Sequence, residues 1–243
     1  MDFFRGIKYN IQGVLFAFAN PKLLWLGLLR FAIILVLALF FSGLVFFWHE
    51  AILAMIWEMP EKGMLLYVWH LASWVLSLLL AAVAVVAAYL VAQVFFCVYI
   101  MDYMSRLTEK IVLGTEVSYA QSSWLSFFVY LVCQEIPRAV IPLVITLAVM
   151  VMGLFTPLGP VILVLSSITA GVFLAWDNTD LVLARKMMPF GQRIAFLRQT
   201  LWFHVGFGLL FLIPWVNIVM LSFAPVGATL YHIQKKTVET GRS

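Results

Sequence analysis

The sequence predicts an all-α integral membrane protein. We expect two long transmembrane helices, two part-penetrating (re-entrant) helical hairpins and an N-terminal amphipathic helix. Hydrophobic residues make up 65% of the chain and charged residues only 11%, a balance found in membrane proteins rather than in soluble domains. Two long apolar runs lack any Asp, Glu, Lys or Arg, and later, shorter apolar runs are interrupted by proline. We expect residues 1–243 to form a single membrane domain.

The first element is predicted at residues 3–19. Its polar face consists of Arg5, Lys8 and Gln12. Its apolar stripe consists of Phe4, Ile11, Leu15 and Phe18. Helical spacing places the two sets on opposite faces, which is typical of a helix that lies on a membrane surface. Pro21 ends this helix, because a proline disfavours helical geometry in the residue before it.

Two long transmembrane helices are predicted at residues 23–48 and 64–112. The first contains an uncharged run of 18 residues, Phe31–Trp48, and the second contains one of 38 residues, Met64–Met101. At about 1.5 Å per residue the second run alone would extend about 57 Å, more than the thickness of a bilayer core. Its polar continuation is expected to be a water-exposed helix that ends at Gly114 as a C-cap.

The two hairpins are predicted at residues 120–176 and 188–234. Their apolar legs are residues 139–153, 161–176, 199–213 and 218–232, which is 15, 16, 15 and 15 residues. Each leg is shorter than the roughly 20 residues of a usual span, so we expect the proline-containing tips to stop inside the membrane. The alternative is two pairs of short but complete transmembrane helices in a thin bilayer.

The distribution of charge predicts the topology. Of the 15 Lys and Arg residues only Lys62 lies in the 49–63 loop, beside Glu50, Glu58 and Glu61. By the positive-inside rule this loop faces outward and both termini are cytoplasmic. The polar segment between the hairpins is expected to form a solvated face near anionic lipid headgroups. Its charged residues are Asp177, Asp180, Arg185, Lys186, Arg193 and Arg198.

Several short motifs resemble one known family. They are Pro137-Arg138-Ala139, Ile213-Pro214-x-x-Asn217 and Gly227-Ala228-Thr229, within Ile136–Val149 and Leu212–His232. With these motifs, and in the order of its elements, the chain resembles the CysZ-type sulfate permeases of bacterial inner membranes. The resemblance implies two long transmembrane helices with half-penetrating hairpins, and import of sulfate for sulfur assimilation.

The resemblance also implies an anion site where the N-terminal segment enters the first long helix, at a Gly-Leu-Arg-like motif. Here the motif reads Gly27-Leu28-Leu29-Arg30, with one residue inserted. We expect Arg30 to bind the anion with help from the Gly27 backbone, and Leu28 and Lys22 are further candidates. A dianion near low dielectric needs fixed donors such as arginine. The alternative is that Arg30 and Lys22 are anchors at the membrane interface.

Arg138 is a second candidate ligand because apolar runs flank it. Glu135 lies one helical turn earlier and would pair with it or moderate its attraction for anions. Small polar residues of the hairpins are expected to line a pathway, or alternatively to cap helices and join them. They are Ser166, Asn217 and Thr229.

No pattern of an enzyme, a metal site, a cofactor site or a nucleic-acid-binding face is visible in the sequence. Cys97 and Cys133 are expected to be buried packing thiols. The expected partners are sulfate or sulfite, membrane lipids and further copies of the chain. The leading hypothesis is a permease or channel for sulfate or a related oxyanion. The rival is a non-transporting membrane protein with an assembly or regulatory role and the same fold.

Overall fold

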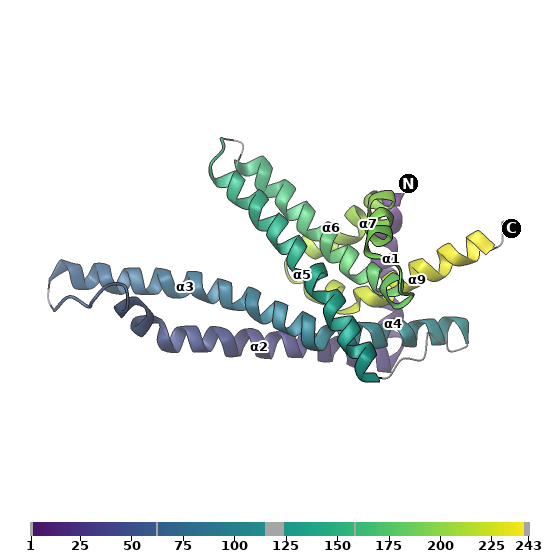
Figure 1. Cartoon of the computed structure of the whole chain (residues 1–243), viewed down its shortest axis with the longest axis horizontal. Helices are drawn as coiled ribbons and strands as arrows, with labels where there is room; N and C mark the ends of the chain where they lie inside the picture. Colours follow the sequence, from purple (N-terminus) through teal and green to yellow (C-terminus); the bar gives the residue numbers. More distant parts are fainter. Residues whose placement is uncertain (1, 62, 115–123, 158, 241–243) are drawn as a thin grey trace. The chain divides into compact units, whose positions relative to one another are not determined.

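The computed structural model describes residues 2–61, 63–114, 124–157 and 159–240, and every regular element in these ranges is a helix (Figure 1). Four described helices are long and apolar enough to cross a membrane, or five candidate spans exist if one bent pair counts as a span. They are Pro21–Ala54, Met64–Leu113, Gly159–Arg185 and Val216–Lys235, with Phe190–Leu212 as the bent pair. The prediction of an all-α membrane protein is therefore confirmed, whereas the re-entrant arrangement stays a prediction.

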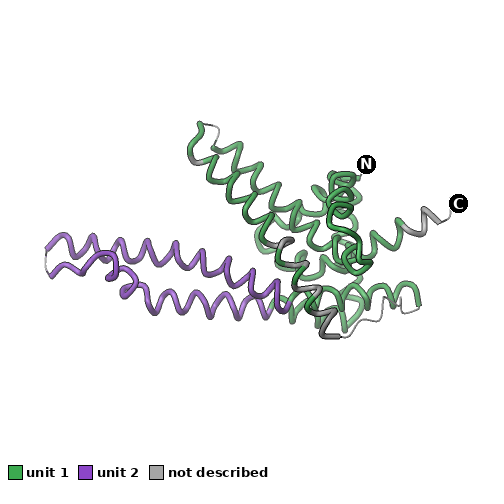
Figure 2. The backbone as a smooth tube through the Cα atoms, viewed as in Figure 1, with its two compact units in different colours: residues 1–31, 97–243 green, residues 32–96 purple. Residues whose placement is uncertain are grey.

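The chain forms two compact units (Figure 2). Unit 1 comprises residues 1–31 and 97–243, and unit 2 comprises residues 32–96. Helix α2 (Pro21–Ala54) begins in unit 1 and continues through unit 2.

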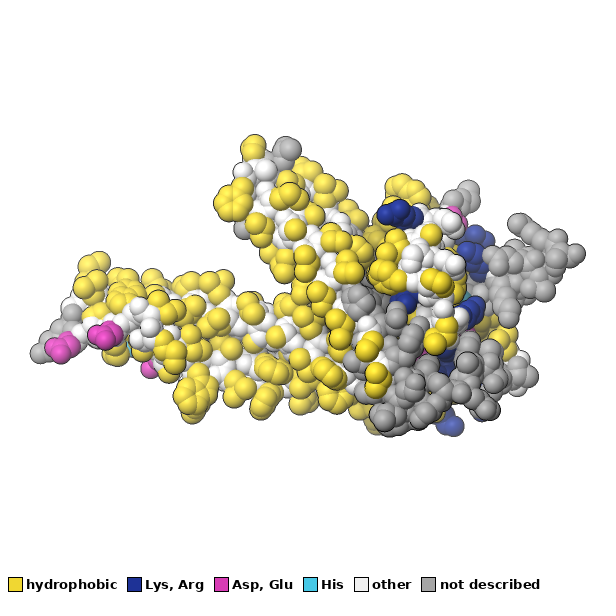
Figure 3. All heavy atoms as spheres, viewed as in Figure 1, with side chains coloured by type: hydrophobic (Ala, Val, Ile, Leu, Met, Phe, Trp, Pro, Cys, Tyr) yellow, Lys and Arg dark blue, Asp and Glu magenta, His cyan; other side chains and the backbone are white. Residues whose placement is uncertain are grey.

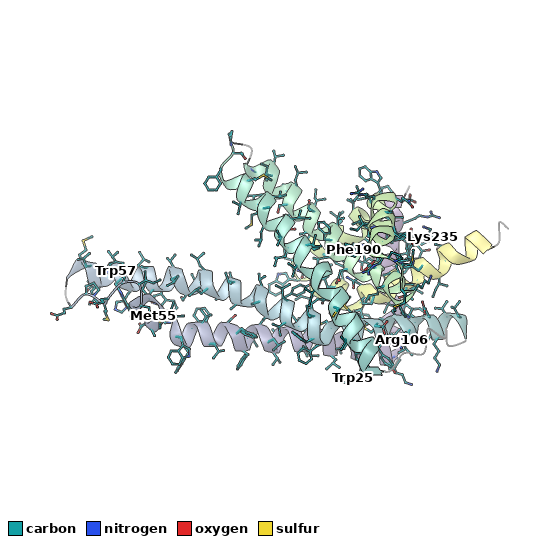
Figure 4. The ribbon with its side chains drawn as sticks, viewed as in Figure 1. Trp25, Met55, Trp57, Arg106, Phe190 and Lys235 are labelled. Atoms are coloured by element: carbon teal, nitrogen blue, oxygen red, sulfur yellow. The ribbon has the colours of Figure 1, made fainter. Side chains whose placement is uncertain are left out.

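Unit 2 contains most of α2 together with α3 (Met64–Ala92) and the start of a π-helical turn, η1 (Gln93–Cys97). Met55 and Trp57 lie in the turn between the two helices (Figure 4). The indole N–H of Trp69 donates to the carbonyl of Trp57 at 2.9 Å and holds this turn. Apolar side chains cover both helices from end to end, and acidic groups gather at the turn (Figure 3). Such a surface suits lipid rather than water.

The second long helix continues into unit 1 as α4 (Val98–Leu113). Residues Met64–Leu113 together make 50 helical residues, about 75 Å at the usual rise. Gly114 ends the helix with φ of 71°, and its N–H donates to the carbonyl of Lys110 at 3.0 Å. The predicted C-cap is confirmed, because this left-handed geometry favours glycine.

The first hairpin is formed by α5 (Trp124–Leu154) and α6 (Gly159–Arg185), of 31 and 27 residues. Both exceed the apolar legs predicted for them. Helix α5 continues through Pro142, and α6 continues through the polar residues after Trp176. The hydroxyl of Ser166 donates to the carbonyl of Thr146 at 3.3 Å and ties the two helices together. Cys97 is buried as predicted, but Cys133 on α5 is exposed, so the prediction for Cys133 is wrong.

The second hairpin is more broken. Helices α7 (Phe190–Gln199) and α8 (Leu201–Leu209) are followed by a 3-10 turn, η2 (Leu210–Leu212). The axis bends by 77° between α7 and the α8–η2 segment. After the turn at Trp215, which has φ of 66°, the chain enters α9 (Val216–Thr240).

Helix α1 (Asp2–Phe18) packs on α8 and α9 within unit 1. Its apolar stripe and its polar face are both exposed, as a membrane-surface helix requires. A third face, which the prediction did not include, is buried against protein. It consists of Gly6, Tyr9, Asn10, Gly13, Val14 and Ala17.

Two glycine contacts permit this packing. A Cβ atom added to Gly206 would lie 1.9 Å from the carbonyl oxygen of Phe3, and one added to Gly13 would lie 2.4 Å from the backbone nitrogen of Gly227. Aromatic side chains fill the space around these contacts. The rings of Phe203 and Tyr231 are stacked, with 3.9 Å between their centroids.

We expect Gly206→Ala to lower the free energy of unfolding by about 2 kcal/mol, because the added methyl must push α1 away from α8. Thermal unfolding of the purified protein in detergent measures this change. Gly191→Ala is the matched control, since no atom lies within 4 Å of a Cβ added there. Equal stability of the two variants would contradict the close packing of α1.

Candidate functional site

Helix α9 contains a proline in its interior, and this proline creates an unusual hydrogen-bond acceptor. Pro225 has no N–H, so the carbonyl of Leu221, four residues earlier, cannot receive its helical hydrogen bond. The guanidinium of Arg30 supplies the missing donor, with 2.6 Å between Nη1 and the Leu221 oxygen. Arg30 therefore satisfies a partly buried backbone group that the proline leaves without its helical partner.

Arg30 is itself almost completely buried, with only 2% of its surface exposed. Within the part of the chain that the structure describes, its one partner is the Leu221 carbonyl. A carbonyl accepts a hydrogen bond but carries no net charge, so the positive charge of Arg30 is not neutralised by a described carboxylate. A buried cation without a counter-charge attracts an anion strongly.

The other residues of the predicted Gly-Leu-Arg-like motif occupy different environments. Gly27 is buried inside α2, where a Cβ would lie 2.2 Å from the ring of Phe223, so Gly27 makes room for that ring. Leu28 is 47% exposed, and Lys22 is exposed near the start of α2. The motif thus buries the Arg30 side chain beside α9, one helical turn after the glycine that receives the Phe223 ring. Anion binding by Gly27, Leu28 and Lys22 stays a prediction.

A second arginine, Arg185 at the end of α6, holds together α4 and α6. Its Nε lies 3.1 Å from Asp102 Oδ1, and its Nη1 donates to Glu109 Oε2 at 3.1 Å. Asp102 also pairs with Arg106, which is labelled in Figure 4 on α4. The two carboxylates and two guanidinium groups therefore balance one another in this cluster.

A chain of hydroxyl groups connects this cluster with α9. Arg185 Nη2 donates to the Ser105 hydroxyl, and Ser105 Oγ lies 2.7 Å from Thr229 Oγ1. The Thr229 hydroxyl donates to the carbonyl of Pro225 at 2.7 Å, so Ser105 must be the donor in its bond with Thr229. Thr229, which was predicted to line a pathway, is fully buried and acts here as a hydrogen-bond link.

A third arginine, Arg193 on α7, is paired with Asp180 on α6. Both side chains are fully buried, and the Nε and Nη2 atoms of Arg193 donate to the two carboxylate oxygens of Asp180. The neighbouring Thr179 hydroxyl lies 2.8 Å from His204 Nε2. The Thr179 hydroxyl itself donates to the carbonyl of Trp176 at 3.1 Å, and His204 Nδ1 lies 2.8 Å from the carbonyl of Thr200, to which a protonated Nδ1 donates.

The expectation that this polar segment is a solvated face is wrong for four of its residues. Asp177, Asp180, Arg185 and Arg193 are buried. Lys186 and Arg198 are exposed as predicted. The expectation of a water-exposed helix after Met101 is wrong for one face, where Asp102, Ser105 and Glu109 are buried, whereas Arg106 and Lys110 on another face are exposed. The spacing of the three buried residues, which is three, four and seven, marks one face of a helix, and this signal could have shown that the polar residues share a partner.

Two of the remaining predicted residues have partners other than Arg30. Ser166 links α6 to α5, and Asn217 lies in the first turn of α9, where its N–H donates to the Ile213 carbonyl at 3.0 Å. Glu135 and Arg138 lie on α5, but their side chains fall outside the described ones.

A family model described as sulfate transporter CysZ/etoposide-induced protein 2.4 matches residues 9–222. A search of curated proteins finds no match.

We expect Arg193→Met to lower the free energy of unfolding by about 3–5 kcal/mol, because it leaves the Asp180 carboxylate buried without its cation. The double variant Asp180→Leu/Arg193→Met should recover most of that loss. Thermal unfolding in detergent measures both. Arg5→Met is the control: Arg5 pairs with Asp2 at 3.4 Å on an exposed face, so its loss should change stability by less than about 0.5 kcal/mol. If Arg193→Met lowered the free energy of unfolding as little as Arg5→Met does, the ion pair of Arg193 with Asp180 would not be buried in the folded protein.

Proposed function

Because this chain belongs to the family described as sulfate transporter CysZ/etoposide-induced protein 2.4, we propose that it is a permease or channel for sulfate or a related oxyanion. The family match confirms the resemblance predicted from the sequence motifs. We further propose that the protein lies in a bacterial inner membrane with both termini in the cytoplasm, and that it imports the anion for sulfur assimilation.

The single observation that carries the proposal is the environment of Arg30. Three described cations are buried: Arg30, Arg185 and Arg193. The latter two have carboxylate partners at ion-pair distance, and the partner of Arg30 among the described residues is a main-chain carbonyl. An oxyanion beside Arg30 would supply the negative charge that this part of the protein lacks. Guanidinium groups bind sulfate-like oxygens through paired, charge-assisted hydrogen bonds.

Transport also requires that the anion leaves again. A single arginine without further described cations would hold a dianion less tightly than a cluster of them, which suits a permeation site. The membrane setting agrees with this role, because the candidate spans expose apolar side chains and Lys and Arg residues gather on unit 1 (Figure 3).

The two hairpins would complete the pathway. We propose that their tips penetrate part of the membrane, that Arg138 attracts anions and that Glu135 moderates this attraction. Ser166 and Asn217 would offer weak polar contacts along the route, and several copies of the chain would assemble around it.

Removal of the Arg30 charge should impair sulfate uptake. Proteoliposomes that contain the full chain should take up labelled sulfate with saturation, and sulfite should compete. Arg30→Gln should reduce this uptake at least about tenfold, because the neutral amide keeps a donor for the Leu221 carbonyl but removes the charge. Lys8→Gln, on the exposed face of α1, is the charge-matched control and should leave uptake unchanged.

Uptake no greater than in empty liposomes, by protein shown to be folded and inserted, would contradict the proposal. It would favour the rival function, a non-transporting membrane protein with an assembly or regulatory role. A deletion strain that grows normally on limiting sulfate but has a defective envelope would point the same way.

The second prediction concerns Arg138. We expect Arg138→Gln to lower sulfate uptake while thermal unfolding remains near that of the unaltered protein, since an intramembrane cation attracts the anion. Unchanged uptake would remove Arg138 from the pathway without affecting the proposal for Arg30.

A further inference from the structure

We propose that Pro225 and the carbonyl of Leu221 form a positioning device for Arg30, which directs the Nε–Nη2 edge of its guanidinium toward the anion and selects oxyanions over halides. This inference rests on the proposed function and deepens it. It assigns to α9 a role in anion selectivity that neither the Gly-Leu-Arg-like motif nor the family match assigns.

The first step is the origin of the acceptor. In a continuous helix the N–H of residue 225 would bond to the carbonyl of residue 221. Proline removes that N–H, and its ring also pushes against the same carbonyl, which therefore turns away from the helix axis. Arg30 Nη1 donates to this oxygen at 2.6 Å, a short bond typical of a charged donor.

The second step concerns the edge of the Arg30 guanidinium that does not contact Leu221. A guanidinium has two edges that can each form a fork, and Nη1 lies on the opposite side from the edge formed by Nε and Nη2. The bond to Leu221 therefore uses Nη1 and leaves the Nε–Nη2 edge without a described protein partner.

The third step compares the Nε–Nη2 edge of Arg30 with the same edge of Arg193, whose partner the structure shows. In Arg193 the Nε and Nη2 atoms donate to the two oxygens of the Asp180 carboxylate, one atom to each. Two oxygens on one central atom are also the feature that sulfate, sulfite and selenate share. A halide has one centre and cannot use both donors with good geometry, so the fork favours oxyanions.

The fourth step is rigidity. Phe223, two residues from Leu221 and from Pro225, is 3% exposed, and its ring fills the notch that Gly27 leaves in α2. Phe18 packs on the same ring with 5.6 Å between ring centroids. The Leu221 carbonyl is thus fixed relative to the turn of α2 that carries Arg30, and this keeps the orientation of the guanidinium constant.

Pro225→Ala tests the device directly. Alanine restores the N–H that bonds to Leu221, and this bond competes with Arg30. Because alanine is the better helix former, α9 should still form, and thermal unfolding shows whether the variant is folded. Binding of labelled sulfate to the purified full chain in detergent should weaken about tenfold, and the preference for selenate over chloride as competitor should shrink.

Two further variants sharpen the test. Arg30→Lys keeps the charge and a donor for the carbonyl but lacks the fork, so it should also lose preference for selenate over chloride. Pro160→Ala is the control, because Pro160 lies in the first turn of α6, where no helical carbonyl loses its partner. Its affinity and preference should not change.

The outcomes separate the two proposals. Unchanged sulfate affinity and selectivity in a folded Pro225→Ala variant would overturn the positioning device and leave the permease proposal intact. Selective sulfate binding that weakens in Pro225→Ala, without any flux in liposomes, would support the device and refute transport. Absence of sulfate binding by the unaltered protein would overturn both.

Discussion

The carbonyl of Leu221, which Pro225 leaves without a helical N–H, is the constraint on which the arrangement of unit 1 depends. A proline inside a helix leaves one carbonyl without its N–H partner, and away from water another group must satisfy that carbonyl. Here Arg30, which is distant in sequence, satisfies it at 2.6 Å. The carbonyl of Pro225 itself receives the Thr229 hydroxyl, which ends the hydrogen-bond chain from Arg185 through Ser105. Pro225 therefore connects α9 to two networks that contain an arginine. Its missing N–H leaves the Leu221 carbonyl to Arg30 of α2, and its own carbonyl accepts from Thr229, which is linked through Ser105 of α4 to Arg185 of α6. Disturbance of α9 at this point would reach both.

The close approach of helix backbones explains how polar networks can be buried in so apolar a chain. Glycines let α1, α8 and α9 approach until the contact at Gly206 leaves no room for a methyl group. Short helix separations exclude water and lower the local dielectric, so buried charges must be paired to be tolerated. Asp180 with Arg193, and Asp102 and Glu109 with Arg185, satisfy this requirement. The same low dielectric strengthens the field of any cation that lacks a carboxylate.

Much of the fold could be predicted from the sequence, because long uncharged runs have few physical alternatives to transmembrane helices. Gly114 could be predicted as a C-cap because its signal is local. The burial of Asp180, Arg185 and Arg193 could not be predicted from composition, since it depends on partners elsewhere in the chain, such as Glu109, 76 residues from Arg185. The third face of α1 was missed for a similar reason: small residues such as Gly6 and Gly13 carry little hydrophobicity and are recognised only when another backbone lies against them. Arg30 could be identified as a candidate, but its link to Pro225 required the structure.

A site for a transported anion must satisfy two opposed requirements, and the partner of Arg30 meets both. A carboxylate would hold the guanidinium in place but would cancel the charge that attracts the anion, as Asp180 does for Arg193. Solvent would preserve the charge but would leave the long side chain without a fixed orientation. A main-chain carbonyl orients one donor and leaves the net charge of +1 in place. A helix carbonyl that has lost its N–H partner offers its full acceptor capacity to a side chain, so an interior proline gives a helix a direct way to provide a strong acceptor. The pairing of Arg30 with Leu221, four residues before Pro225, is the arrangement that this reasoning requires.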